Sequence, residues 1–211
     1  MKAISKQFKE DIKSLIAEYE SKTSAQIVPV LLNTSDSYPS AHFRWALLLS
    51  LIFPVLLYLS PITFNDPVEF LIAQAIGVIA GFLIAFNPRA KRLFLTKKQM
   101  NEEVYQRAIQ AFHEHNLTQT TKRNAVLIFV SFFERRIHII ADSGASQKID
   151  NKKWEQIIND QLGALKKGSY ETSLMQLIHA AGDLLTEYFK PEMNINSHND
   201  KSALDDELRT D

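Results

Sequence analysis

Two consecutive apolar stretches dominate the pattern of polar and apolar positions along the chain. Residues 45–64 contain no ionisable acid or base, and residues 68–86 carry one carboxylate, near their start. A helix needs roughly 20 apolar residues to cross a hydrocarbon core of about 30 Å, and both stretches meet this length. Only residues 65–67 separate them. The pattern therefore predicts a transmembrane hairpin that leaves residues 1–44 and 87–211 on one side of the bilayer.

A helical hairpin buried inside a soluble domain is the alternative interpretation of these two stretches. An amphipathic helix on a soluble core would show charged residues along one face at a period of 3.6, and neither stretch does so. A cleavable signal peptide does not fit, because the first stretch follows 44 residues of patterned, mostly polar sequence.

Basic residues flank the two apolar stretches, and the connecting turn has none. Cytoplasmic loops carry an excess of Lys and Arg, so we expect two spans in the cell inner membrane with both termini in the cytoplasm. The same residues would hold the chain at anionic lipid, at roughly 1 kcal/mol each. These membrane-anchoring residues are Arg44, Arg89, Lys91, Arg92, Lys97 and Lys98.

Four small residues lie four positions apart along the second stretch: Ala73, Gly77, Gly81 and Ala85. They form one stripe along a helix, and small side chains allow a second helix to approach closely within lipid. Two partners fit this stripe. One is the first helix of the same hairpin, and the other is a second copy of the chain in a homodimer.

The periodicity of the remaining sequence predicts a small mixed sheet flanked by helices, an α/β fold interrupted by the hairpin. The strand at 25–32 contains Pro29, which lacks a donor and indicates an edge or an irregularity. The two strands after the hairpin predict a β-hairpin. The predicted helices cover 4–19, 102–115, 154–165 and 174–188, and the predicted strands cover 25–32, 124–133 and 136–141.

The predicted domain organisation follows from these elements. Residues 1–44, with the first helix and strand, and residues 98–190 form one domain. The spans at 45–64 and 68–86 interrupt it. Residues 191–211 have no periodicity and an excess of acid, so we expect a disordered acidic tail.

The sequence from Lys122 to Leu185 resembles the TPM domain, a family named for its thylakoid and bacterial members, and residues 21–38 resemble the opening strand of that family. The resemblance implies an α/β sandwich with a short mixed sheet. The matching features are the apolar strand Ile128–Phe133, the turn Glu134-Arg135, the strand Arg136–Ala141, then Asp142, Gly144, Trp154 and the step Gly168-Ser169-Tyr170.

Some TPM proteins are described as acid phosphatases or calcium binders, with acidic residues in the loops at the strand ends. The usual pattern places an Asp-Asn-Gly-like step before the second strand. This chain has Lys122-Arg123-Asn124 there, so two cations replace an oxygen ligand. The departure weakens the case for metal-assisted hydrolysis. Other members resemble envelope-assembly or scaffold modules, which is the function that the resemblance favours here.

Three aspartates are the candidate ligands for a hard cation such as Ca²⁺ or Mg²⁺: Asp36, Asp142 and Asp150. Such ions take six or more oxygens, and nothing in the sequence supplies the rest. Capping of turns and helix N-termini accounts equally well for each aspartate. Asp142 is the strongest candidate, since it directly follows a buried strand.

The histidines do not form a recognisable metal or catalytic motif. His113 and His115 lie two positions apart, so on a helix their rings point some 200° apart. His138 lies within a strand and His179 within the last helix, and neither has a partner at ligand spacing. The chain has no cysteine, no HExxH and no Gly-rich phosphate loop.

Two functional hypotheses from different classes follow. The favoured one is an integral membrane protein that presents a TPM-like domain at the membrane surface as an interaction or assembly module without a cofactor. The alternative is a membrane-anchored, metal-dependent hydrolase like the acid phosphatases. Expected partners are the lipid bilayer, a membrane or envelope protein, and a second copy of the chain. The balance of 24 basic and 24 acidic residues does not indicate nucleic acid.

Overall fold

The computed structural model describes residues 5–61, 66–120, 122–167, 170–191 and 209–210. The chain forms two compact units. The first, which we call the α/β domain, consists of residues 1–35 and 101–211. The second, which we call the hairpin unit, consists of residues 36–100.

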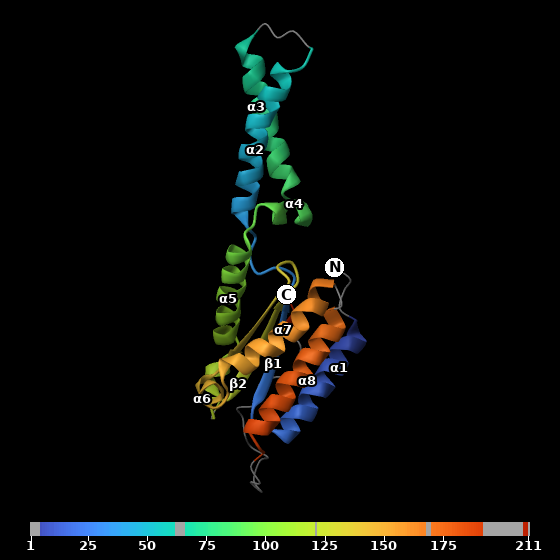
Figure 1. Ribbon diagram of the computed structural model, residues 1–211, viewed down its shortest axis with the longest axis vertical. Coiled ribbons are helices and arrows are strands. Elements are labelled where there is room, and N and C mark those ends of the chain that lie inside the picture. Colours follow the sequence, from blue (N-terminus) through green and yellow to red (C-terminus); the bar gives the residue numbers. More distant parts are fainter. Residues whose placement is uncertain (1–4, 62–65, 121, 168–169, 192–208, 211) are drawn as a thin grey trace. The chain divides into compact units, whose positions relative to one another are not determined.

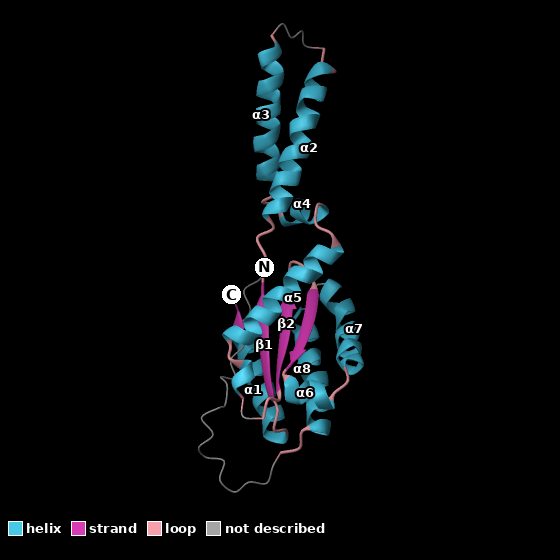
Figure 2. Ribbon diagram, turned by 90° about the vertical axis from the view of Figure 1, so that its left-hand side faces the viewer, coloured by secondary structure: helices cyan, strands magenta, loops and turns pink. Residues whose placement is uncertain are grey.

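A mixed sheet in the order β3-β2-β1-β4 forms the centre of the α/β domain (Figure 2). β1 pairs with β2 in parallel, and β2 pairs with β3 in an antiparallel hairpin. This confirms the predicted mixed sheet flanked by helices. The strands are β1 (Gln26–Leu32), β2 (Ala125–Ser131), β3 (Arg136–Ala141) and the two-residue β4 (Arg209–Thr210).

The short strand β4 was not predicted, because residues 191–211 were expected to be disordered. Arg209 and Thr210 pair in parallel with Val30 and Leu31 of β1. Most of the expected tail, residues 192–208 and 211, lies outside the described residues. Pro29 lies opposite Ile128 of β2 and precedes Val30, where the pairing of β1 with β4 begins. The amide donor that proline lacks is therefore at a position that does not pair with β4.

Helices cover both faces of the sheet (Figures 1 and 2). Apolar side chains of α1 (Lys6–Lys22), α7 (Asn151–Lys167) and α8 (Tyr170–Tyr188) pack on one face, and those of α5 (Lys97–Glu114) pack on the other. Every residue of β2 is buried, as its nearly continuous apolar sequence predicts. The short helices η1 (Leu117–Gln119) and α6 (Ser143–Lys148) lie before β2 and after β3.

Helix α1 shows how the sequence specifies these elements. Ser5 caps its N-terminus by accepting a hydrogen bond from the Phe8 amide at 3.1 Å. The apolar side chains that recur at helical spacing along it are buried: Phe8, Ile12, Leu15, Ile16 and Tyr19. Ile4, where the predicted helix starts, lies outside the described part of the chain.

The hairpin unit consists of α2 (Pro39–Tyr58), α3 (Pro67–Ile84) and the short α4 (Pro88–Leu93). Each of these helices begins with proline, which suits a first helical position because that position needs no amide donor. The first helix begins six residues before the predicted span at 45. The predicted boundary at 45 marks the point after which charged residues are absent. A helix can contain charged residues, so α2 starts before that point.

Candidate functional site

The outer surface of the hairpin unit is made of large apolar side chains. Only 22% of α2 and 17% of α3 are buried, and both helices are long and apolar enough to cross a membrane. Leu47, Leu51, Leu71, Ile79 and Leu83 are each 59–64% exposed. A core helix of a soluble protein would bury most of these groups. An exposed apolar surface of this extent marks a membrane or protein interaction site.

The small residues of α3 face the other helix of the same hairpin. A Cβ atom on Gly81 would lie 2.3 Å from the Trp45 carbonyl oxygen, and one on Gly77 would lie 2.4 Å from that of Leu49. Ala73 and Ala85, the other members of the stripe, are also buried. The stripe therefore brings the two backbones into contact. Of the two partners considered from the sequence, the structure places the intramolecular one against it.

Polar contacts join the end of the hairpin that lies next to α4. The Lys91 ammonium donates to the Ser37 carbonyl at 3.0 Å, and the Trp45 indole donates to the Ala90 carbonyl at 2.8 Å. Arg44 donates to the Phe94 carbonyl. Three of the predicted membrane-anchoring residues, Arg89, Lys91 and Arg92, lie in α4. The side chains of Arg44, Arg89, Lys97 and Lys98 are exposed.

In the α/β domain, Asp142 is buried and acts as the N-cap of α6. Its Oδ1 accepts from the Ser143 amide at 2.7 Å, and its Oδ2 accepts from Arg123 Nε at 2.8 Å. The carboxylate side chain is 3% exposed, whereas that of Arg123 is 50% exposed. One of the two cations that depart from the TPM pattern thus neutralises the strongest candidate ligand.

The other two candidate aspartates also accept local backbone hydrogen bonds, Asp36 in a turn before α2 and Asp150 as a cap before α7. Asp36 accepts from the Tyr38 amide at 2.8 Å in the hairpin unit, and Asp150 accepts from the Lys152 amide at 3.1 Å before α7. No group of three or more His, Asp or Glu side chains suited to a metal occurs among the described residues.

A buried glutamate that the sequence did not single out lies in the turn between β2 and β3. Glu134 is 1% exposed and accepts from the Thr34 hydroxyl at 3.2 Å and the Ser35 amide at 3.0 Å. It also accepts from Ser131. The carboxylate fixes the loop that leaves β1 to the β2–β3 turn. The resemblance to the family identified Glu134-Arg135 only as a two-residue turn and gave no sign that the glutamate is buried.

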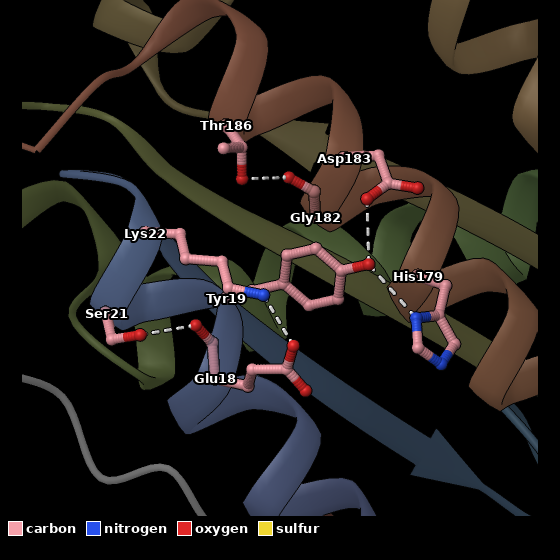
Figure 3. A network of polar contacts seen from close by, with 8 residues as sticks. All are labelled: Glu18, Tyr19, Ser21, Lys22, His179, Gly182, Asp183 and Thr186. Atoms are coloured by element: carbon pink, nitrogen blue, oxygen red, sulfur yellow. Dashed lines mark hydrogen bonds and ion pairs between the residues drawn. The ribbon is translucent and has the colours of Figure 1, made fainter.

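A second polar cluster joins α1 to α8 (Figure 3). The Tyr19 hydroxyl donates to Asp183 Oδ1 at 2.8 Å and lies 3.0 Å from His179 Nδ1. The hydroxyl has one proton, so Nδ1 must donate in the second contact. Gly182 lies under the Tyr19 ring, where a Cβ would come within 2.4 Å of it. Tyr19 is the last residue of the helix predicted at 4–19, and its polar partners come from a helix about 160 residues later in the chain.

This cluster predicts an alkaline transition. Burial, followed by the hydrogen bond to Asp183, raises the pKa of Tyr19 to about 12 from 10.0. Because the pKa of Tyr19 is higher in the folded protein than in the unfolded chain, its stabilising contribution is fully present below the unfolded-state pKa. The contribution is lost as the pH rises through the folded-state pKa. Tyr19→Phe should cost about 1 kcal/mol near neutrality. Urea unfolding should show the difference from wild type shrinking above about pH 10, whereas a constant difference would contradict this.

His138 is a partly buried histidine on the α5 side of the sheet. Its ring lies 5.6 Å from that of Tyr105. Burial, and then the charge of Arg136, lower its pKa below the usual value. Its Nε2 has no hydrogen-bond partner within the described part of the chain. A neutral ring against an aromatic neighbour fits a packing role.

Comparison with known proteins supports the assignment of the domain. The TPM domain family matches residues 89–184. The NMR structure of the BA42 protein from the psychrophilic bacterium Bizionia argentinensis is similar, with a TM-score of 0.59 and 17% identity over 100% of this chain and 97% of that chain. This likeness shows the fold. No curated protein matches the chain. The family match and the fold agree with the predicted resemblance, and the chain therefore contains a TPM domain.

Proposed function

We propose that this protein is an integral membrane protein that presents its TPM domain at the membrane surface as an interaction or assembly module. The observation that carries the proposal is the apolar outer surface of α2 and α3. These helices contact each other through small residues and expose their large aliphatic side chains. This distribution suits lipid, in which close backbone contact holds helices together while apolar groups face outward.

The position of the hairpin in the chain supports its role as a tether. The chain leaves the α/β domain after β1 and returns before β2, and these two strands are parallel neighbours. Both ends of the hairpin are thus joined covalently to the same domain. A tether inserted within a fold holds the domain by two covalent connections, which limits its rotation more than a terminal anchor does.

The orientation follows from charge. Six basic residues flank the apolar stretches, and none lies in the turn between them. By the positive-inside rule, the TPM domain lies in the cytoplasm and the turn lies on the outer side of the inner membrane.

Interaction is favoured over hydrolysis because the buried carboxylates have structural partners. Asp142 is held by Arg123 and a helix amide, and Glu134 by two hydroxyls and an amide. An Arg⁺ already paired with Asp142 raises the electrostatic cost of holding a divalent cation there.

Calorimetry and an activity assay on the detergent-solubilised protein separate the two functions. We expect neither micromolar affinity for Ca²⁺ or Mg²⁺ nor turnover of a generic phosphomonoester. Turnover that Asp142→Asn abolishes would place the protein among the hydrolases instead. Asp150→Asn is the matched control, since it changes an exposed cap of the same type.

Photocrosslinking in native membranes tests the interaction. A groove of about 430 Å³ between α7 and α8 is lined by polar and apolar side chains of both helices, among them Gln156, Asp160, Asp183 and Glu187. A photoreactive residue at Gln156 should give one discrete adduct with a membrane protein, and one at the exposed Glu10 of α1 should not. Equal, diffuse labelling at both positions would contradict an assembly role for this face.

A further inference from the structure

One polar side chain lies on the otherwise apolar outer surface of the hairpin unit. Gln74 of α3 is exposed, and so are Leu71 and Val78, which lie one helical turn before and after it on the same side of the helix. Within residues 45–57 and 70–84, every other exposed side chain is apolar. The carboxamide of Gln74 therefore interrupts a surface that is otherwise suited to lipid.

The hairpin itself does not provide a partner for this carboxamide. Gln74 makes no hydrogen bond to another residue in the described part of the chain. Residues 62–65, which the description of the hairpin leaves out, precede α3, and about 10 Å of that helix separates them from Gln74. The buried stripe of small residues on α3 already packs against α2.

The position of Gln74 along the span makes an unpaired amide unfavourable. Six residues of the apolar stretch 68–86 precede it, so about 9 Å of helix separates it from the nearer end of that stretch. The hydrocarbon core offers no water to hydrogen-bond with the amide. Lysine and arginine near helix ends reach the interface with long side chains, whereas the glutamine side chain is shorter and starts deeper in the span.

We infer that the hairpin binds a second copy of the chain through the Gln74 side of α3, an inference that rests on the proposed membrane function. A carboxamide carries both hydrogen-bond donors and an acceptor, so two glutamines related by a twofold axis can each donate to the other. A hydrogen bond between helices within lipid satisfies both amides. Leu71 and Val78 supply apolar contacts on either side of the pair.

A second copy fits this position better than an unrelated membrane protein does. Both copies insert with the same orientation, so the twofold axis runs along the membrane normal and the two Gln74 side chains lie at the same depth. A partner of another sequence would need a polar group of its own at that depth. This contact face also differs from the small-residue stripe, which the sequence offered as a homodimer contact and which packs within the hairpin.

Energy transfer between donor-labelled and acceptor-labelled full chains in phosphatidylcholine liposomes tests this inference. The chain has no cysteine, so the dyes can be attached at Lys152→Cys, an exposed position of α7. Transfer should rise with the ratio of protein to lipid and then saturate. Gln74→Leu should raise the dissociation constant about tenfold, because the hydrogen bonds between the two helices are lost while the surface stays apolar.

Two further variants separate the amide from a general change of the helix surface. Gln74→Asn keeps a carboxamide, so its dissociation constant should stay within about threefold of the wild-type value. Ile79→Leu is the matched control, because Ile79 is also exposed and lies about 140° from Gln74 around the helix. It should change the dissociation constant by less than about twofold.

Disulfide crosslinking between chains locates the contact face. A single cysteine at Val78, about 40° from Gln74 around α3, should join two copies, whereas one at Ile79 should not. Equal crosslinking at both positions would show random collision and would contradict the proposed face. A photoreactive residue at Val78 that captures a different protein in native membranes, and not a second copy, would also contradict the inference.

Alkaline carbonate extraction of the same liposomes distinguishes failure of the dimer from failure of the membrane assignment. Wild-type protein that stays with the lipid but shows no saturable energy transfer would overturn the dimer and leave the membrane function standing. Saturable transfer that Gln74→Leu leaves unchanged would overturn the role of the amide and with it the inference. Release of the wild-type protein from the lipid would overturn both proposals.

Discussion

Replacement of Gly81 by leucine should separate the two apolar helices of the hairpin. The Cβ atom of any larger residue would lie 2.3 Å from the Trp45 carbonyl oxygen and 2.6 Å from the Ala46 Cα. These are backbone atoms, so no change of rotamer can relieve the contact. The helices must move apart by the depth of a side chain, and the close contact that holds them together in lipid is lost.

Disulfide crosslinking measures this separation, because the chain has no native cysteine. The contacts of Gly81 with Trp45 and of Gly77 with Leu49 advance by four residues, so the next step pairs Ala73 with Phe53. Cysteines at 53 and 73 should crosslink readily in the wild-type background and about tenfold more slowly with Gly81→Leu.

The matched control is Ala75→Leu, which adds a side chain of the same size on the exposed face of α3. Crosslinking should be unchanged in this variant. Retained crosslinking in Gly81→Leu, or equal loss in both variants, would show that the small residues do not set the distance between the helices.

Gly182→Ala should destabilise the α/β domain although alanine is the better helix former. The new Cβ would lie 2.4 Å from Cγ of Tyr19, a rigid ring that connects α1 to α8. Relief requires α1 to shift, which breaks the hydrogen bonds of Tyr19 to Asp183 and His179 (Figure 3). Overpacking of this kind costs about 1–3 kcal/mol. Urea unfolding followed by tryptophan fluorescence measures the change.

Gly163→Ala in α7 is the control, because a Cβ there meets nothing within 4 Å. It should stabilise the domain by about 0.5–1 kcal/mol, so the same substitution has opposite signs at the two positions. In a Tyr19→Leu background the cost of Gly182→Ala should fall, and the double-mutant cycle isolates the contact. Additive effects would refute the proposed clash.

The fold could be predicted from the sequence where burial follows local periodicity. The inner face of α1 and the continuous apolar sequence of β2 identify a helix and a two-sided strand without any long-range information. The small-residue stripe of α3 identified a contact face in the same way. Which helix packs against this stripe depends on the geometry of the hairpin, and the spacing of the small residues alone does not determine it.

The polar clusters could not be predicted, because their members are distant in the chain. Tyr19 meets Asp183 across 164 residues, and Glu134 meets Ser35 across 99. The pairing of β4 with β1 likewise depends on tertiary contact, in a segment whose composition favours disorder. Asp142 shows a further limit, since the sequence identified its position and only the structure reveals that Arg123 occupies its carboxylate.

The most direct test of the membrane hairpin is the labelling of single cysteines in intact cells. One variant carries a cysteine at Asn65, between the apolar stretches, and another at Ser202, near the C-terminus. An impermeant maleimide should label position 65 in intact cells and position 202 only after permeabilisation. Labelling of 202 but not 65 would reverse the orientation. Protection of both positions until permeabilisation would contradict a hairpin that crosses the membrane.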